Sequence, residues 1–519
     1  MRRLALLAAL LGIVCLALSA QAQVQLKLLR SFNISGIFDG TPSSCGEGAI
    51  DVAFDGVNAY VIGFRASSGN GTVGIVRIDD VLNLPSGNLT YGAGVSRILS
   101  WTAAGVSRDS RLVYHNGVLY AGFGLGHGTS PETAIVRLDT FGNVDALWAV
   151  DGILSPAEIG VTRYEAIAVD PGYAGTGSAL AVGSLGTRTI RRVSFTAGTL
   201  LGNSNNFAPD FLRDIAFAPN GDVYIHRASG DVNDGIFKAV RTGVDSYGTL
   251  VRIVPFDAGN FQQCTVNYVP VSAVYPTLTD FIAYNLRTPT IDPTTHKLYL
   301  ADPNGNPLGE WDGSGETLDG VSVSAFRHNL INATHFITPD GRLLLLVVSG
   351  HVPASPAGTI DRLDVLEVLP AIEVGGSVVL RDFGGDVSTV PVTIEIRNPG
   401  ETTPLETYNV DLDSTGAYRL VTSLYGTFDV AAKASHWLRQ VIPNVNLTAP
   451  VTLNFSLING DIDGDNEVTL LDFGALVAAF GSMPGDSNWN PNADLDGDDE
   501  VTLLDFGVLV RNFGLLGDE

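Results

Sequence analysis

Cysteine is scarce in this sequence, which excludes a fold held together by disulfides. Three cysteines occur in 519 residues, and Cys15 lies in an apolar N-terminal run that we expect to be cleaved off. Cys45 and Cys264 can pair in an oxidising compartment or remain two buried thiols, because sequence does not fix their separation in space. Hydrophobic cores must therefore stabilise the chain, and its length predicts about two to four domains.

Basic residues are also few. The chain has 30 Lys and Arg against 55 Asp and Glu, giving a net charge of −25. The absence of a basic stripe argues against nucleic acid and anionic membranes as partners. Residues 459–519 contain 14 acidic side chains and one basic side chain, Arg511. This local density of carboxylates favours the binding of cations.

Long apolar runs are absent beyond the N-terminus. Residues 1–22 have the features of a secretory signal peptide: Arg2 and Arg3, the apolar run Leu4–Leu18, and the small residues Ala20 and Ala22 at a cleavage site. The apolar run of about 15 residues is short for a membrane span of roughly 20. We therefore expect a secreted protein, extracellular or at the cell surface, without membrane insertion.

Familiar catalytic motifs are absent as well. The sequence has no HExxH, no GxSxG, no P-loop and no Cys/His zinc pattern. His115, His226 and His335 lie at or near predicted hairpins and could converge on one site. Three aspartates also recur near the hairpins, and we expect them to form turns rather than an acid–base pair; they are Asp214, Asp292 and Asp340. Catalytic residues are thus unknown from sequence.

Residues 24–370 repeat a pattern of strand, turn and strand. The copies begin at Asp51, Arg111, Ala166, Asp214, Thr290 and His335. Their turns are rich in Asp, Pro, Asn and Gly, which favour hairpins. A spacing of roughly 45 to 75 residues suits blades of about four strands each. We predict a β-propeller of six blades, or seven because the gap before Thr290 is wide; a sandwich tandem or a solenoid is the alternative. The pattern resembles the blade core of sugar-, peptide- and lactone-processing propellers.

Residues 372–457 contain short alternating strands, a size and pattern typical of a small β-sandwich. The segments GGSVVL, VTIEIRNPG, LDSTGAYRL and YGTFDVAAKASHWL resemble the carboxypeptidase regulatory-like domain, a transthyretin-like sandwich. The resemblance implies a spacer that stiffens the chain, with an exposed binding face as the alternative. We expect His436 and Trp437 to pack in the core and at its edge.

A duplication marks the C-terminal region. Asp461–Gly481 and Asp494–Gly514 are offset by 33 residues and identical at 16 of 21 positions. Calcium needs about six to eight oxygen ligands, which one tight loop supplies from positions 1, 3, 5, 7, 9 and 12. The predicted ligands are Asp461, Asp463, Asp465, Glu467, Thr469 and Asp472 in the first copy, and Asp494, Asp496, Asp498, Glu500, Thr502 and Asp505 in the second.

Other loop positions support this prediction. Asn466 and Asp499 stand where glycine is common, and both residue types tolerate a left-handed backbone. Val468 and Val501 are expected to point into a small core. The apolar stretches Phe473–Phe480 and Phe506–Phe513 each predict a helix after the loop.

A calcium loop closed by aspartate and followed, but not preceded, by a helix resembles a type I dockerin. The resemblance implies a small helical module over residues 459–519, two calcium ions, and a cohesin-type or cell-surface protein as partner. Dockerins often carry a Ser-Thr pair at positions ten and eleven, where they meet a cohesin. Here the pairs are Leu470-Leu471 and Leu503-Leu504, which either form an apolar partner-binding face or pack internally.

Together these features predict a mainly β, modular secreted protein. The dockerin-like module would dock it to a partner, and the propeller would recognise a ligand, a glycan, in polysaccharide breakdown. One alternative is a glycoside hydrolase or lyase acting on O-glycosyl bonds in the propeller channel. The other is a non-catalytic cell-surface or adhesive protein.

Overall fold

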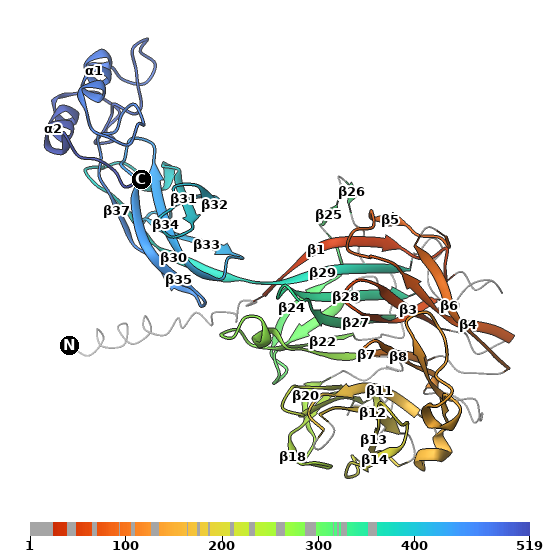
Figure 1. The fold of residues 1–519 in the computed structure, drawn as a ribbon. Coiled ribbons are helices and arrows are strands. Elements are labelled where there is room, and N and C mark those ends of the chain that lie inside the picture. The colour runs from red at the N-terminus through yellow and green to blue at the C-terminus, as the bar shows by residue number, and fades with distance from the viewer. Residues whose placement is uncertain are drawn as a thin grey trace, which may run out of the picture. The chain divides into compact units, whose positions relative to one another are not determined.

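The computed structural model describes residues 24–38, 48–64, 70–92, 94–104, 109–125, 134–162, 164–173, 177–184, 187–207, 212–227, 234–255, 265–285, 297–314, 316–318, 321–322, 330–350 and 361–519. The predicted signal peptide, Cys45, Cys264 and Asp292 lie outside these residues. The chain divides into two compact units, Met1–Leu369 and Pro370–Glu519 (Figure 1).

Six sheets of four or more strands make up the described part of the first unit, with two small hairpins beside them. The first two sheets contain β2 (Gly48–Phe54), β3 (Ala59–Phe64), β4 (Asn70–Ile78) and β6 (Val95–Ala104), and then β7 (Asp109–His115), β8 (Val118–Leu125), β9 (Ala134–Asp139) and β10 (Ile153–Leu154). The third and fourth contain β11 (Tyr164–Asp170), β12 (Ala179–Ser184), β13 (Ile190–Val193) and β14 (Leu200–Asn203), and then β15 (Leu212–Phe217), β16 (Val223–Arg227), β17 (Gly235–Ala239) and β20 (Val251–Pro255). The fifth and sixth contain β21 (Val266–Val269), β22 (Phe281–Asn285), β23 (Leu298–Ala301) and β24 (Pro307–Trp311), and then β27 (Leu330–Ile337), β28 (Leu343–Gly350), β29 (Arg362–Pro370), β1 (Val24–Asn33) and β5 (Gly87–Asn88). The hairpins are β18 (Arg241–Gly243) with β19 (Ser246–Tyr247), and β25 (Thr317–Leu318) with β26 (Val321–Ser322).

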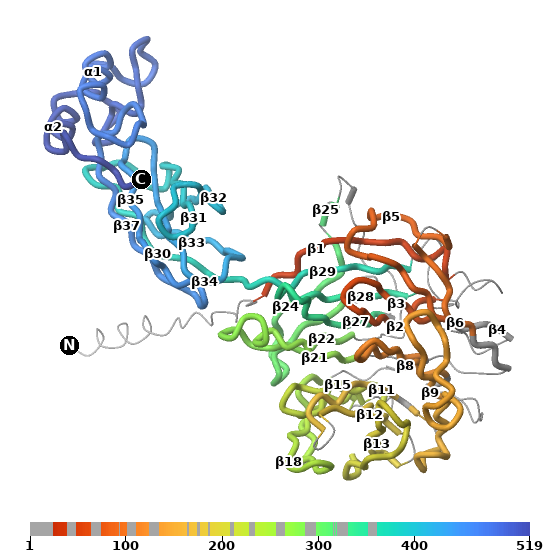
Figure 2. The backbone as a smooth tube through the Cα atoms, viewed as in Figure 1, coloured from red at the N-terminus to blue at the C-terminus, as the bar shows by residue number. Residues whose placement is uncertain are grey.

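These sheets form a ring. The first strand of each sheet contacts the first strand of the next, in the order β2, β7, β11, β15, β21 and β27, and β27 contacts β2 again. The N-terminal strand β1 lies beside β29 in the last sheet (Figure 2). Because a strand from one end of the chain completes the blade at the other end, the ring is closed. A β-propeller of six blades is confirmed for the described residues.

The fifth blade corrects one detail of the sequence interpretation. Its first strand is β21, which the repeat pattern missed, and the pattern at Thr290 leads instead into the third strand, β23. Residues 270–280 separate β21 from β22 and include a 3₁₀ turn, Val271–Ala273. This connection is longer than those between the first two strands of the other five blades, so the wide gap before Thr290 does not indicate a seventh blade.

Two four-stranded sheets open the second unit. One contains β33 (Ala417–Thr422), β30 (Ile372–Leu380), β36 (Val451–Thr452) and β37 (Phe455–Leu457), and the other contains β32 (Pro404–Val410), β31 (Val392–Arg397), β34 (Gly426–Ala434) and β35 (Gln440–Leu447). Alternate residues of β31 and β33 are buried, as in sheets that cover a core with one face. Trp437 is fully buried and His436 stacks on it at 3.8 Å, so both pack internally as expected.

Two loop–helix repeats complete the second unit, with helices α1 (Leu470–Ala479) and α2 (Leu503–Asn512). Each begins three residues before its predicted start, because the hydroxyl of Thr469 or Thr502 caps its first turn. Val468 and Val501 lie in the core between the repeats, as predicted. Short 3₁₀ turns elsewhere span Trp148–Val150, Pro156–Ile159 and Val387–Thr389. None of the described helices is long and apolar enough to cross a membrane.

Candidate metal centre and docking face

The first loop gathers three of its predicted ligands. Asp461, Asp463 and Asp472 each offer a carboxylate oxygen, and these oxygens lie within 4.8 Å of one another. Asp472 Oδ1 accepts the N–H groups of Ile462 and Asp463 at 2.6 and 3.1 Å, and its Oδ2 accepts the N–H of Thr469 at 2.7 Å. The closing residue thereby ties the end of the loop to its beginning.

The second loop repeats this arrangement. Asp494, Asp496 and Asp505 form the equivalent cluster. Asp505 accepts the N–H groups of Leu495, Asp496 and Thr502 at 2.6, 3.1 and 2.7 Å. The same sequence spacing thus gives the same geometry twice.

The remaining predicted ligands lie outside these clusters. Asp465 and Asp498 accept the N–H groups of Glu467 and Glu500 within their own loops, both at about the usual hydrogen-bond length (2.9 and 3.0 Å). Both glutamate side chains are exposed. Thr469 and Thr502 use their hydroxyl groups as helix caps. Asn466 and Asp499 have φ of +72° and +66°, so both adopt the left-handed backbone that was predicted.

The donor chemistry of both clusters fits a hard cation. Oδ1 of Asp461 and Oδ1 of Asp496 are buried and have no hydrogen-bond partner among the described residues. Burial and the neighbouring carboxylates, Asp505 foremost, raise the pKa of Asp496 to about 6. Burial also raises the pKa of Asp463 and of Asp494. A divalent cation would satisfy the open oxygens and remove the repulsion between carboxylates.

An exposed pair of leucines lies at the start of each of the two helices. Leu470 and Leu471 are 72% and 66% exposed, and Leu503 and Leu504 are 72% and 63% exposed. Internal packing of these leucines, one of the two sequence-based alternatives, is therefore wrong. We call these four residues the leucine face.

The sandwich contacts both loops, which sequence reasoning missed. The ammonium group of Lys433 lies 2.6 Å from Oδ2 of Asp461, whose carboxylate is fully buried. At the second loop, the N–H of Gly384 donates to the carbonyl of Asp496 at 2.7 Å. No local pattern could have revealed these contacts, because the pairs are 28 and 112 residues apart in sequence.

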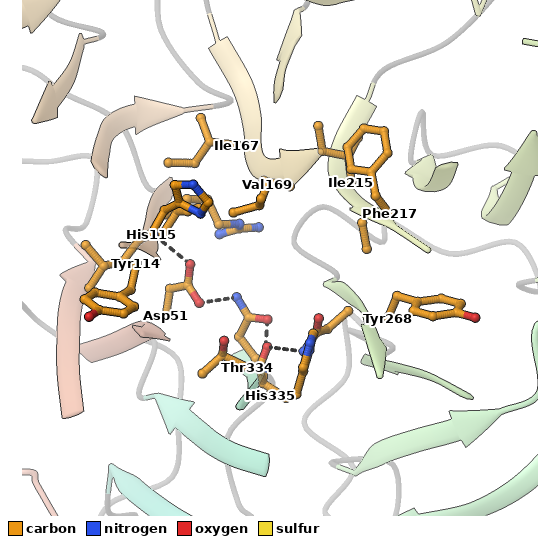
Figure 3. Close-up of a pocket in the computed structure, with 18 of the residues that line it drawn as sticks. Asp51, Tyr114, His115, Ile167, Val169, Ile215, Phe217, Tyr268, Thr334 and His335 are labelled. Atoms are coloured by element: carbon orange, nitrogen blue, oxygen red, sulfur yellow. Dashed lines mark hydrogen bonds between the residues drawn. The ribbon is translucent and has the colours of Figure 1, made fainter. Parts of the chain in front are cut away.

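A separate cavity of about 460 Å³ occupies the centre of the propeller, lined by the first strands of all six blades (Figure 3). Aromatic and histidine side chains line part of it, among them Tyr114, His115, Phe217, Tyr268 and His335. The structure thus brings two of the three histidines singled out from sequence to the channel. The third, His226, is buried on β16 and does not line the cavity.

Two buried aspartates face the same cavity. Asp51 Oδ2 accepts the N–H of Leu112 in the next blade at 2.8 Å, and its Oδ1 accepts the amide of Asn332 in the preceding blade at 2.7 Å. Burial raises the pKa of Asp51 to about 7, although the Arg111 guanidinium and N–H donors act in the opposite direction. These bonds join Asp51 to both neighbouring blades.

Asp214 has the equivalent place in the fourth blade. Its Oδ2 accepts the N–H of Val266 in the fifth blade at 3.0 Å, and its Oδ1 lies 3.5 Å from Nε of Arg111. The expectation that Asp214 forms a turn is wrong, because it lies within β15 and faces the channel. Asp340 does lie in the turn between β27 and β28.

The family comparison covers the two loop–helix repeats. The model of the dockerin type I domain matches residues 459–514. This segment is a dockerin type I domain.

Dockerin domains bind calcium, and the two carboxylate clusters fit that property. Dockerin domains also bind cohesin partners, so this dockerin supports calcium-dependent docking to a cohesin. The leucine pairs at helix positions where the family often carries Ser-Thr distinguish this dockerin from that pattern.

Three solved structures illustrate what the chain is similar to. A type II cohesin–X-dockerin complex of Acetivibrio cellulolyticus, an N-terminal interface mutant, is 24% identical over 28% of this chain and 97% of that chain, with a TM-score of 0.24. The PQQ-bound aldose sugar dehydrogenase of Streptomyces coelicolor is 13% identical over 67% and 99%, with a TM-score of 0.37. The Cps50 (Swd1) β-propeller domain of Myceliophteria thermophila is 11% identical over 66% and 99%, with a TM-score of 0.35. A search of curated proteins finds no match.

Proposed function

We propose that this chain is a secreted modular protein that holds two calcium ions in its dockerin, docks through it to a cohesin-type partner, and carries a propeller that recognises a glycan in polysaccharide breakdown. The observation that carries the docking half is the pair of carboxylate clusters, each followed by the same capped helix. The signal peptide predicted over residues 1–22 would export the chain to a calcium-rich environment.

One ion would lie in each loop. The first would be held by Asp461, Asp463 and Asp472, with further oxygens from Asp465, Glu467 and Thr469. The second would be held by Asp494, Asp496 and Asp505, with further oxygens from Asp498, Glu500 and Thr502. Calcium neutralises the clustered carboxylates, so the protein's own contribution is to keep these oxygens together and anchor the loops through Val468 and Val501.

The leucine face is the proposed contact with the partner. Its four side chains lie at equivalent places in the two repeats and are all more than 60% exposed. Exposed apolar side chains are typical of protein interaction sites when a partner covers them. A partner with an apolar surface, rather than one that hydrogen-bonds to Ser and Thr, would suit them.

Capture of the full chain by immobilised type I and type II cohesins tests this proposal. We expect capture in calcium, its loss in EGTA, and a loss of at least about tenfold in affinity when all four leucines are changed to glutamate, because truncated interface anchors commonly cost more than 1 kcal/mol each. Leu405→Glu, at an exposed leucine of the sandwich, is the matched control and should bind normally. The proposal would be contradicted if EGTA left capture unchanged, or if the quadruple leucine variant bound as well as the Leu405→Glu control.

Glycan recognition is proposed for the propeller channel. Aromatic rings beside polar groups suit the apolar faces and hydroxyl groups of sugars, and the cavity volume of about 460 Å³ is within the usual range for small-molecule sites. Asp51 and Asp214 use oxygens to join neighbouring blades, which favours binding over a hydrolytic pair.

Calorimetric titration of the full chain with a panel of soluble oligosaccharides tests this second part. We expect at least one to saturate, and Tyr114→Ala to weaken it about tenfold by removing a stacking surface. The control is Tyr91→Ala, at an exposed tyrosine outside the cavity lining. If no oligosaccharide saturates, or if both variants bind like the unmodified chain, the channel is not a glycan site.

A further inference from the structure

The two calcium loops differ in the charge around them. The loop 461–472 contains five carboxylates, whereas the loop 494–505 contains six because Asp499 replaces Asn466. Only the first loop has an ammonium group on a ligand: Lys433 lies 2.6 Å from Asp461. No ion pair to Asp494 occurs among residues 361–519, all of which the structure describes. The first loop is thus less negative than the second by two charges.

Lys433 is firmly placed by the sandwich. It lies on β34, and its ammonium group also donates to the carbonyl of Trp437 at 2.8 Å and that of Ser435 at 3.3 Å. The side chain is 20% exposed, so solvent screens its charge only partly. The sandwich therefore holds this positive charge in a fixed place beside the first loop.

The ammonium group of Lys433 contacts one of the two carboxylate oxygens of Asp461. It bonds to Oδ2 of Asp461, which also accepts the N–H of Asn466 at 3.1 Å. Oδ1 of the same carboxylate is buried and has no partner among the described residues. In the second loop, by contrast, the equivalent Asp494 Oδ1 accepts the N–H groups of Gly497 and Asp498 at 2.9 and 3.2 Å.

We propose that the two calcium sites are unequal, and that Lys433 of the sandwich weakens the first site relative to the second. Calcium held by Asp461 shares one carboxylate with a fixed positive charge, and like charges so close repel each other. The second loop has one more carboxylate beside its ligands, that of Asp499, and no such cation. Negative charge close to a bound cation stabilises it. Lys433 also replaces part of the missing charge when calcium is scarce, so the first loop stays attached to the sandwich.

This inference rests on the proposed function, because it requires both loops to bind calcium. Calcium titration of the full chain by calorimetry, with Asp494→Asn and Asp461→Asn isolating one site each, separates the two. We expect the site left in Asp461→Asn to bind at least about tenfold more tightly than the site left in Asp494→Asn. Equal affinities, or the opposite order, overturn the inference, whereas an unmodified chain that takes up no calcium overturns the proposed function itself.

Lys433→Met in the Asp494→Asn background tests the role of the ammonium group. We expect it to tighten the remaining site about tenfold and to leave the site in the Asp461→Asn background unchanged. Lys297→Met, which breaks a lysine–carboxylate pair with Glu310 in the propeller, controls for the loss of one positive charge. Unchanged or weaker binding in the first site overturns the role of Lys433. If Lys433→Met does not fold, as judged by circular dichroism, the order of the two single-site variants still decides whether the sites are unequal.

Discussion

At the scale of single residues, sequence spacing predicted well which side chains come together when those residues lie close to one another in the chain. The positions of the first, third and closing aspartates correctly predicted both carboxylate clusters, because the members of each cluster lie within one loop of twelve consecutive residues. Asp465 and Asp498 departed from this pattern because they lie outside the two clusters, and they accept the N–H groups of Glu467 and Glu500. Lys433 could not be predicted, because its contact with Asp461 depends on the packing of a sandwich on a dockerin.

Gly464 and Gly497 provide a matched residue-scale test of that packing. They have the same place in the two loops, with φ of +83° and +77°, so alanine costs about 1 kcal/mol of backbone strain at either. A Cβ at 464 would meet nothing within 4 Å, but at 497 it would lie 2.3 Å from the ring of Phe383. That ring packs edge-on against the buried Trp437 at 5.4 Å.

We therefore expect Gly497→Ala to lower the free energy of unfolding of the second unit by about 1–3 kcal/mol more than Gly464→Ala does, because the sandwich must yield. Urea unfolding of the full chain in calcium measures both. Equal losses in the two variants would show that Phe383 moves away freely and that the sandwich does not hold the second loop.

At the scale of elements, the turn-rich hairpin pattern located blades but not every strand. Five of the six hairpins predicted from sequence begin a blade, because Asp, Pro, Asn and Gly turns connect the first two strands directly. The fifth blade was missed where an eleven-residue connection, 270–280, replaces a tight turn. The pairing of β1 with β29 joins distant parts of the chain, and local periodicity has no information about such contacts.

The helices show a similar limit. Their apolar stretches were recognised, but their starts were placed at Phe473 and Phe506 instead of Leu470 and Leu503. Thr469 and Thr502 cap the helices with their hydroxyl groups, and the carboxylates of Asp472 and Asp505 accept the N–H groups of these two threonines. The leucines therefore belong to exposed first turns, and this placement makes them available to a partner.

At the scale of the whole molecule, the two units carry side chains of different chemistry. The propeller encloses a channel with aromatic and polar side chains, and the second unit contains both carboxylate clusters. More than half of the net charge of −25 falls on residues 459–519, by 14 acidic side chains against one basic. Calcium should therefore act mainly on the second unit, because among the residues that the structure describes both clusters of facing carboxylates lie there.

Scanning calorimetry of the full chain with calcium and with EGTA tests this central claim most directly. We predict that calcium at 100 times its dissociation constant stabilises the second unit by about 2.7 kcal/mol per site and leaves the propeller transition in place. The variant Asp472→Asn with Asp505→Asn identifies the responding transition by losing the shift. A calcium-independent melting temperature for the second unit would contradict the claim that these loops are calcium sites on which docking depends.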